Sequence, residues 1–337
     1  MKYLKYRPLR PALTAASSAL LVFAAACGNP GSESGPESGS PSATSMITVD
    51  NCEDTVDVPH PPQRVMVTGS ESIPTLAQLG VLDSIAVRAG VFPPAYFDEL
   101  TNAALAEIPS LTDRIDATGH LQISMEQTLA EDPDLVLGAT DTVNRQTLAP
   151  HNIPLIEEPA FCGALDGPVT WEDVWEQISL YGNIFDKDAA AEAYISKLKE
   201  QLHSVEEHQE GRGLSVAILY PEVGGATTYA YGNRSMSYPL VETTGLRNVF
   251  GDVEDRVFEV SAEEIVARNP DVIVALHTDG EPAEVINAIT SLRGIGAVPA
   301  VKEKKIMPLL LNYAEPATPL SVQGAQRLND FLRQDKG

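Results

Sequence analysis

The chain has 337 residues, of which 43% are hydrophobic, and its 47 Asp and Glu outnumber its 23 Lys and Arg to give a net charge of −24. This length is enough for two domains with hydrophobic cores of their own. Such an acidic chain repels nucleic-acid phosphates and anionic lipid headgroups, so we expect no nucleic-acid partner.

Residues 1–26 have the pattern of an export signal and are not expected to belong to the fold. A basic start is followed by the apolar segment Leu13–Ala26, which is too short to span a bilayer. Three alanines then lead into Cys27, which resembles a bacterial lipobox, in which the Cys is lipidated and becomes the mature N-terminus. The alternative is an ordinary secretory signal with an incidental Cys. Cleavage removes four positive charges, so the net charge changes from −24 to −28.

Residues 27–45 are predicted to be the lipidated Cys27 and a flexible tether. Gly28–Ser45 contains 13 Gly, Ser or Pro among its 18 residues and cannot pack into a core. Its root-mean-square reach is about 25 Å. We therefore expect a protein held at the extracytoplasmic face of the cell membrane by an acyl chain such as palmitate on Cys27.

Two further cysteines are left in an oxidising compartment. Cys52 and Cys162 are expected to form a disulfide there, and the alternative is a pair of unbridged thiols. The chain has no CxxC or His-rich pattern, so we expect no metal site.

Residues 46–186 predict the first of two α/β lobes. Ile47–Val58 alternates between apolar and polar residues, which is typical of a β-hairpin or an edge strand. Ile73–Leu79 predicts a helix that ends at Gly80. Because strands alternate with helices, we expect a mostly parallel sheet. The expected buried strands are Arg64–Thr68, Ser84–Val87, Leu135–Leu137 and Pro154–Ile156.

A long helix is predicted between the two halves of the chain. Residues 187–209 contain no Gly or Pro, and at 1.5 Å per residue they form a helix about 34 Å long. We expect this helix to join the lobe at residues 46–186 to a second lobe at residues 210–337. Its apolar residues fall on one face: Tyr194, Ile195, Leu198, Leu202 and Val205.

The second half restarts the strand–helix pattern. Its expected strands are Ser215–Tyr220, Val272–Leu276 and Lys305–Leu311. Its expected helices are Met236–Thr244 and Val322–Arg333.

A segment of sixteen residues occurs twice in related form. Ile123–Gly138 returns 137 positions later as Val260–Ala275, with five identical positions. Each copy predicts a short helix, capped by Ser124 or Ser261, and then a strand buried on both faces. Two related lobes in one chain indicate a cleft between them.

The order of these segments resembles the substrate-binding proteins of ABC importers for iron–siderophores, haem and cobalamin. Matching segments include PPQRVMVTGSESIPTLAQLGVLDSIAVRAG, the two SxE…PD copies and KEKKIMPLLLNYAEPATPLS. The resemblance implies two Rossmann-like lobes joined by a single long helix, with the ligand between them and an ABC permease as membrane partner. It implies transport without catalysis, so we expect no catalytic residue, no resident cofactor and a monomer.

Ligands of open α/β sheets bind beyond the carboxyl ends of the strands. On the loops expected there, arginines can bind anionic oxygens of a ferric chelate, and tyrosines can stack on ligand rings or donate a hydroxyl. These loops are Gly69–Ser72, Arg88–Tyr96, Ala139–Arg145, Glu157–Gly163, Pro221–Arg234, His277–Glu281 and Asn312–Thr318. The candidate ligand-binding residues are Ser70, Arg88, Tyr96, Arg145, Tyr231, Arg234, His277 and Tyr313.

The identity of the ligand stays open. A ferric siderophore is the leading hypothesis, and haem or cobalamin is the alternative. His277 or Tyr231 would be an axial ligand of haem. Ferric hydroxamates are neutral or cationic, whereas catecholates and citrates are anionic, so the cleft arginines and the acidic surface favour different ligands.

The resemblance also implies one surface glutamate in each lobe that pairs with arginines of the permease. Pro74 occupies the usual position in the first lobe, and Glu71 is the nearest carboxylate. Glu242 is the candidate in the second lobe.

Two other classes of protein are less consistent with the sequence. An extracellular α/β enzyme would need a nucleophile or metal motif, and HExxH, GxSxG and P-loop patterns are absent. A lipoprotein adhesin would bind no small ligand, which a binding measurement can decide.

Overall fold

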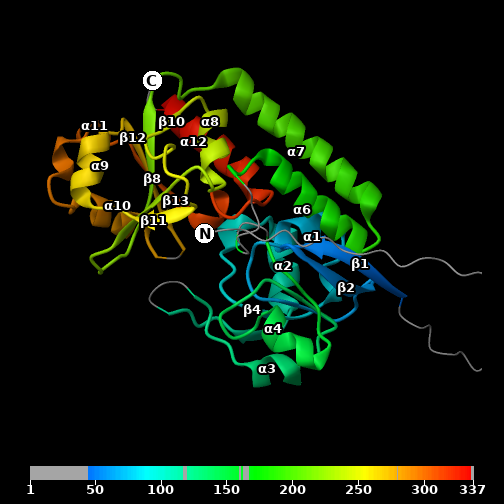
Figure 1. The fold of residues 1–337 in the computed structure, drawn as a ribbon. Helices are drawn as coiled ribbons and strands as arrows, with labels where there is room; N and C mark the ends of the chain where they lie inside the picture. The colour runs from blue at the N-terminus through cyan, green and yellow to red at the C-terminus, as the bar shows by residue number, and fades with distance from the viewer. Residues whose placement is uncertain (1–44, 117–119, 159–160, 162–166, 279, 335–337) are drawn as a thin grey trace, which may run out of the picture. The chain divides into compact units, whose positions relative to one another are not determined.

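The computed structural model describes residues 45–116, 120–158, 161, 167–278 and 280–334. Two helix-covered β-sheets in these residues form two Rossmann-like lobes, which confirms the predicted fold class (Figure 1). The N-terminal lobe runs from β1 to α6 and the C-terminal lobe from β8 to α12. Cys27, the tether up to residue 44 and Cys162 lie outside the described residues.

The N-terminal lobe contains a parallel five-stranded sheet in the order β5-β4-β3-β6-β7. These strands are β3 (Val65–Val67), β4 (Ile85–Ala89), β5 (Ser110–Thr112), β6 (Leu135–Leu137) and β7 (Leu155–Ile156). The predicted hairpin is the antiparallel pair β1 (Ser45–Asn51) and β2 (Asp54–His60). The helices are α1 (Ile73–Leu79), α2 (Glu99–Glu107), α3 (Met125–Ala130), α4 (Arg145–Leu148) and α6 (Trp171–Ile184).

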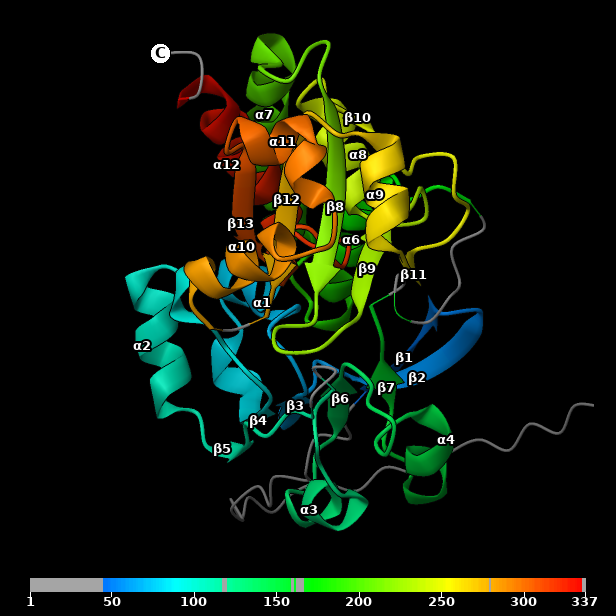
Figure 2. The same ribbon diagram turned by 90° about the vertical axis from the view of Figure 1, so that its left-hand side faces the viewer.

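The C-terminal lobe contains a six-stranded sheet in the order β11-β9-β8-β12-β13, with β10 paired to β8. Its central strands are parallel, whereas β9 is antiparallel to β8 and β11. Figure 2 shows α9, α10 and α11 on one face of this sheet. The strands are β8 (Ser215–Pro221), β9 (Thr228–Tyr231), β10 (Arg247–Asn248), β11 (Val257–Glu259), β12 (Val272–His277) and β13 (Ile306–Leu310). The helices are α8 (Ser237–Thr243), α9 (Ala262–Arg268), α10 (Pro282–Thr290), α11 (Pro299–Lys302) and α12 (Leu320–Gln334).

The long helix α7 (Asp188–His208) joins the two lobes, as predicted (Figure 1). It packs against α1 and α6 of the N-terminal lobe and against α8 and α12 of the C-terminal lobe. Its buried residues belong to one apolar cluster that also contains residues of both sheets. No helix in the described residues is long and apolar enough to cross a membrane.

The two copies of the repeat fold alike. The Ser124 hydroxyl accepts the backbone N–H of Gln127 at the start of α3, and the Ser261 hydroxyl accepts that of Glu264 at the start of α9. Both bonds satisfy N–H groups that the first turn of a helix leaves unpaired. The predicted serine caps are therefore confirmed.

An aspartate in each copy ties its strand to the central strand of the sheet. The Asp134 carboxylate accepts the N–H of Arg64 at 2.9 Å, and the Asp134 N–H donates to the Arg64 carbonyl at 3.0 Å. Asp271 makes the same two bonds with Ser215, at 2.9 and 3.0 Å. These bonds align β6 with β3 and β12 with β8, so equivalent strands end at equivalent places in the two lobes.

Candidate functional site

Residues that follow β3, β4 and β13 meet where the two lobes touch. Asn312 of the C-terminal lobe donates from its side-chain amide to Ser70 Oγ at 3.3 Å and to Glu71 Oε1 at 3.0 Å. The Tyr96 hydroxyl donates to Asn312 Oδ1 at 3.2 Å and accepts the Asn312 backbone N–H at 3.0 Å. We call Ser70, Glu71, Tyr96, Asn312 and Tyr313 the junction cluster.

Tyr313 adds an aromatic contact to the junction cluster. Its ring lies edge-on to the Tyr96 ring, with centroids 5.1 Å apart, and its hydroxyl donates to the Ala95 carbonyl. Arg327 lies 4.4 Å from the centre of the Tyr313 ring and donates to its hydroxyl at 3.0 Å. Burial raises the pKa of Tyr96 and the pKa of Tyr313, so both phenols stay protonated and can donate at neutral pH.

The backbone at Gly69 lets Glu71 reach Asn312. A Cβ atom at Gly69 would lie 2.0 Å from Glu71 Oε2, so a side chain there would collide with the carboxylate. Burial raises the pKa of Glu71, and the hydrogen bond from Asn312 lowers it. The hydrogen bond from Asn312 shows that the Glu71 side chain faces the other lobe, and its role in docking to a permease stays a prediction.

Two acidic side chains of the described residues are buried. Each lies in the loop after the strand that comes last, in chain order, in the sheet of its lobe. Glu158 follows β7 and is 4% exposed, and Glu315 follows β13 and is 1% exposed. The Tyr181 hydroxyl donates to Glu158 Oε1 at 3.0 Å, whereas Oε2 has no hydrogen-bond partner among the described residues. Burial raises the pKa of Glu158 to about 8, because a charged carboxylate is poorly solvated there.

Glu315 is surrounded by donors instead. Its Oε2 accepts from Arg256 Nη1 at 3.1 Å. Its Oε1 accepts from the Ser235 hydroxyl at 2.5 Å and from the backbone N–H groups of Met236 and Ser237. Burial raises the pKa of Glu315, while Arg256 and these donors lower it. Because each of these bonds is donated to the carboxyl group, we assign it as a carboxylate.

The three predicted arginines do not come together. Arg88 lies in β4, and its Nε donates to the carbonyls of Leu105 and Ile108 at the end of α2, at 3.2 and 3.3 Å. Arg145 starts α4 and contacts the β1–β2 hairpin, with Nη1 3.4 Å from Asp54 Oδ2. Arg234 is exposed between β9 and α8. Of the predicted ligand residues, Ser70, Tyr96 and Tyr313 are the ones that share the junction cluster.

The candidate haem ligands are largely buried. His277 is the last residue of β12 and is 8% exposed, and Tyr231 is the last residue of β9 and is 5% exposed. Burial raises the pKa of Tyr231 and keeps its phenol protonated.

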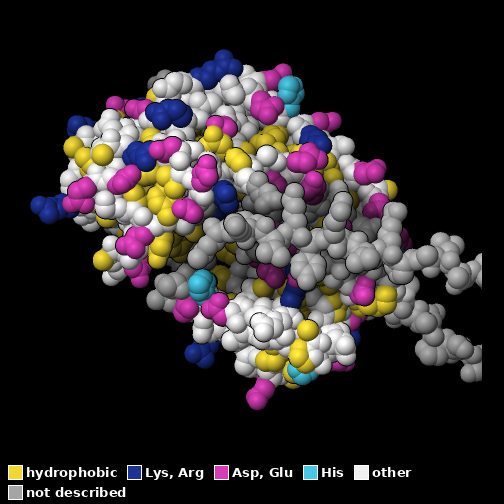
Figure 3. Space-filling model, in the orientation of Figure 1, with side chains coloured by type: hydrophobic (Ala, Val, Ile, Leu, Met, Phe, Trp, Pro, Cys, Tyr) yellow, Lys and Arg dark blue, Asp and Glu magenta, His cyan; other side chains and the backbone are white. Residues whose placement is uncertain are grey.

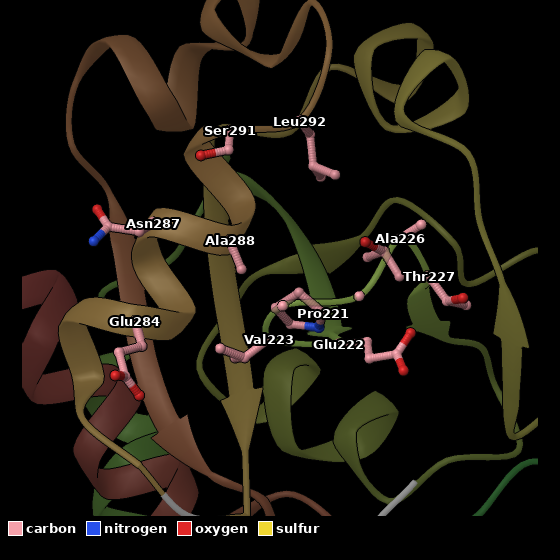
Figure 4. Close-up of a pocket in the computed structure, with 13 residues that line it drawn as sticks. Pro221, Glu222, Val223, Ala226, Thr227, Glu284, Asn287, Ala288, Ser291 and Leu292 are labelled. Carbon is pink, nitrogen blue, oxygen red and sulfur yellow. The ribbon is translucent and has the colours of Figure 1, made fainter. Parts of the chain in front are cut away.

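Two cavities each belong to a single lobe. One of about 480 Å³ lies between the loop at 221–228 and α10 (Figure 4). Figure 4 shows Asn287 and Glu284 pointing away from this loop. The other, of about 550 Å³, lies between Arg88, Phe92 and the side of α2. Neither cavity is lined from both lobes, so neither has the placement expected for a ligand held between them.

A family model described as periplasmic binding protein matches residues 65–309, which is more than half of the chain. The chain belongs to this family. The predicted family resemblance is therefore confirmed. A comparison with curated protein sequences finds no match.

Solved structures of periplasmic binding proteins share the fold. The chain is 44% identical to an ABC-type Fe³⁺-hydroxamate transport system protein of Saccharomonospora viridis, with a TM-score of 0.81, 85% of this chain and 98% of that chain being covered. It is 18% identical to a petrobactin-binding protein of Bacillus subtilis, with a TM-score of 0.62 and coverages of 86% and 99%. It is 17% identical to a periplasmic haem-binding protein of Vibrio cholerae, with a TM-score of 0.60 and coverages of 80% and 99%. The last two likenesses show the fold alone.

Four polar residues of the site were not singled out from the sequence: Glu158, Arg256, Asn312 and Glu315. Three of them lie in loops that were predicted to border the cleft. The sequence signal that could have found these three residues is their position in the loops after β7 and β13, which are equivalent strands of the two lobes. Arg256 stands just before β11, a strand that the sequence analysis did not predict.

Proposed function

We propose that this periplasmic binding protein is the ligand-binding component of an ABC importer and binds a ferric siderophore of the hydroxamate class between its lobes. The observation that carries the proposal is the 44% identity to the S. viridis protein, described as an Fe³⁺-hydroxamate transport system, over 98% of that chain. Binding and release then involve no chemical step.

The contacts between the lobes support this proposal. A chelate held between two lobes needs hydrogen-bond donors and aromatic surface from both, because hydroxamate oxygens are acceptors and the linkers between them are apolar. The N-terminal lobe supplies the ring of Phe161, which is 49% exposed, and the C-terminal lobe supplies the guanidinium of Arg256, which is 34% exposed, on the two sides of the boundary. Figure 3 shows Asp and Glu side chains spread over both lobes, which disfavours an anionic ligand.

A panel of ligands tests the proposal by thermal shift. Ferrioxamine B, ferrichrome, ferric enterobactin, haem and cobalamin are each added to the purified protein. A ferric hydroxamate at 100 times its Kd should raise the melting temperature by roughly 5–10 °C. No shift with any of the five ligands would overturn the proposal.

The same panel decides the haem alternative. A Soret band on addition of haem that is lost in His277→Ala or Tyr231→Phe would favour a haem receptor. We expect no such band, because both side chains are largely buried.

Attachment to the membrane through Cys27 is part of the proposal, and so is the Cys52–Cys162 disulfide. Mass spectrometry of the protein from membranes should find an acylated N-terminal Cys27, and Cys27→Ser should release the protein from the membrane. Peptide mapping without reduction should recover Cys52 linked to Cys162. An unmodified Cys27 or a free thiol at Cys162 would refute the respective part.

Docking to a permease is proposed for Glu242, which is exposed on α8. Glu242→Arg should lower uptake of the ferric chelate in cells without changing its Kd, because the charge opposite the permease arginine is reversed. Unchanged uptake would exclude Glu242 as the docking residue.

A further inference from the structure

Arg256 reaches the boundary between the lobes from the C-terminal side. Its guanidinium carbon lies 5.4 Å from the centre of the Phe161 ring, and Phe161 follows β7 of the N-terminal lobe. The Arg256 side chain is 34% exposed, so the contact leaves part of it accessible to solvent. Arg256 stands just before β11 of the C-terminal lobe and next to the loop after β7 of the N-terminal lobe. It is therefore an accessible cation at the boundary.

Glu315 fixes the position of this cation. The Arg256 Nη1–Glu315 Oε2 distance is 3.1 Å, and the carboxylate is itself held by Ser235 and by two backbone N–H groups. A guanidinium has five N–H donors. The bond to Glu315 uses one of them, so Arg256 keeps donors for another acceptor.

The ion pair between Arg256 and Glu315 also lowers the net positive charge that a ligand meets at the boundary. The buried carboxylate of Glu315 compensates the charge of Arg256, and Glu71 is a further acidic group on the N-terminal side of the boundary. Glu158 adds no charge there at neutral pH, because burial raises its pKa to about 8. Tyr231, which also faces this region, is an uncharged phenol at neutral pH, because burial raises its pKa. A compensated guanidinium attracts an anion weakly but still donates hydrogen bonds to a neutral acceptor.

We propose that Arg256 contacts oxygen atoms of the bound chelate, that Glu315 is its positioning residue, and that the pair selects neutral or cationic ferric hydroxamates over anionic ferric catecholates. This inference rests on the proposed function and extends it to residues and to ligand charge. It also gives Arg256 the role that the sequence analysis assigned to arginines that the structure places elsewhere.

Titration calorimetry with ferrioxamine B and with ferric enterobactin tests both parts. Arg256→Gln should weaken binding of ferrioxamine B at least about tenfold, since hydrogen bonds from charged groups have effects of this order. Arg293→Gln is the matched control, because Arg293 is an exposed arginine of the same lobe, and it should change the Kd less than about twofold. Glu315→Gln should shift the ratio of the two Kd values toward ferric enterobactin by about tenfold, because the guanidinium charge is then uncompensated.

Arg256→Lys separates binding from folding. It keeps a positive charge opposite the buried Glu315, so it should fold like the parent by circular dichroism while losing the planar donors. We expect its affinity for ferrioxamine B to lie between those of the parent and Arg256→Gln. The inference is overturned if Arg256→Gln and Arg256→Lys bind like the parent, or if Glu315→Gln leaves the ratio unchanged. If the parent binds neither chelate, the proposed function itself fails.

Discussion

Asn312 donates a hydrogen bond from its side-chain amide to Glu71 Oε1 across the boundary between the lobes, over 3.0 Å. The same side chain bonds Ser70 and Tyr96, so one amide connects the loop after β13 with the loops after β3 and β4. The two lobes therefore meet through directional bonds as well as through the apolar cluster shared with α7.

Asn312→Ala should destabilise the fold by about 2–3 kcal/mol, because Glu71 and the Tyr96 hydroxyl lose a partner in a buried place. Chemical denaturation measures the change. Asn287→Ala makes the same substitution at an exposed position of α10 and should cost no more than about 0.5 kcal/mol. Equal effects of the two substitutions would show that the junction cluster does not stabilise the fold.

Gly324 lets α12 approach the segment that carries Asn312 and Tyr313. A Cβ atom at Gly324 would lie 1.9 Å from the Tyr313 carbonyl oxygen, so Gly324→Ala must displace α12 or this segment. We expect a loss of about 1–3 kcal/mol in thermal denaturation and a weaker affinity for the chelate.

Gly296→Ala is the matched control for Gly324→Ala. In the part of the chain that the structure describes, no atom lies within 4 Å of a Cβ atom placed at Gly296, and its backbone needs no left-handed conformation. This substitution should be neutral or slightly stabilising. If Gly324→Ala behaves in the same way, the close approach of α12 does not position the junction.

Glu158 should make stability depend on pH. Burial raises its pKa to about 8 from an ordinary value of 4.5, so between these values the folded chain holds a proton that the unfolded chain has released. The free energy of unfolding should therefore fall as pH rises from about 5 to 8, by up to about 1.4 kcal/mol per pH unit for one proton. Tyr181, Gln177 and Glu71 are the groups that interact with this carboxyl.

Glu158→Gln replaces the protonated acid by a neutral amide and should remove this contribution. The variant should gain stability relative to the parent as the pH rises to 8, measured by denaturation at each pH. Glu200→Gln on the exposed face of α7 makes the same chemical change and should leave the slope unaltered. Parallel curves for Glu158→Gln and the parent would contradict the assignment of a raised pKa.

Much of the fold could be predicted because local signals and tertiary packing agree. The bounds of α1 are as predicted, since Gly80 adopts the left-handed conformation that ends the helix. The buried strands β6 and β12 followed from aliphatic runs, and α7 followed from an uninterrupted apolar face. Each of these features depends on residues close together in the sequence.

The site was harder to predict because it depends on where side chains point. Arg88 stands near the end of β4 and Arg145 starts α4, yet their donors are taken by carbonyls at the end of α2 and by the β1–β2 hairpin. The burial of Glu158 and Glu315 cannot be recognised from sequence, because an acidic residue in a loop is normally exposed. Only the folded chain brings Arg256 against Glu315, 59 positions away.

The most direct test of the account is the location of iron in crystals of the protein with ferrioxamine B, measured by anomalous scattering at the iron absorption edge. The account predicts one iron site between the lobes, bordered by Arg256 and Phe161, with chelate oxygens in contact with the Arg256 guanidinium. Iron bound within one lobe only, as in the cavity between the 221–228 loop and α10, would contradict it.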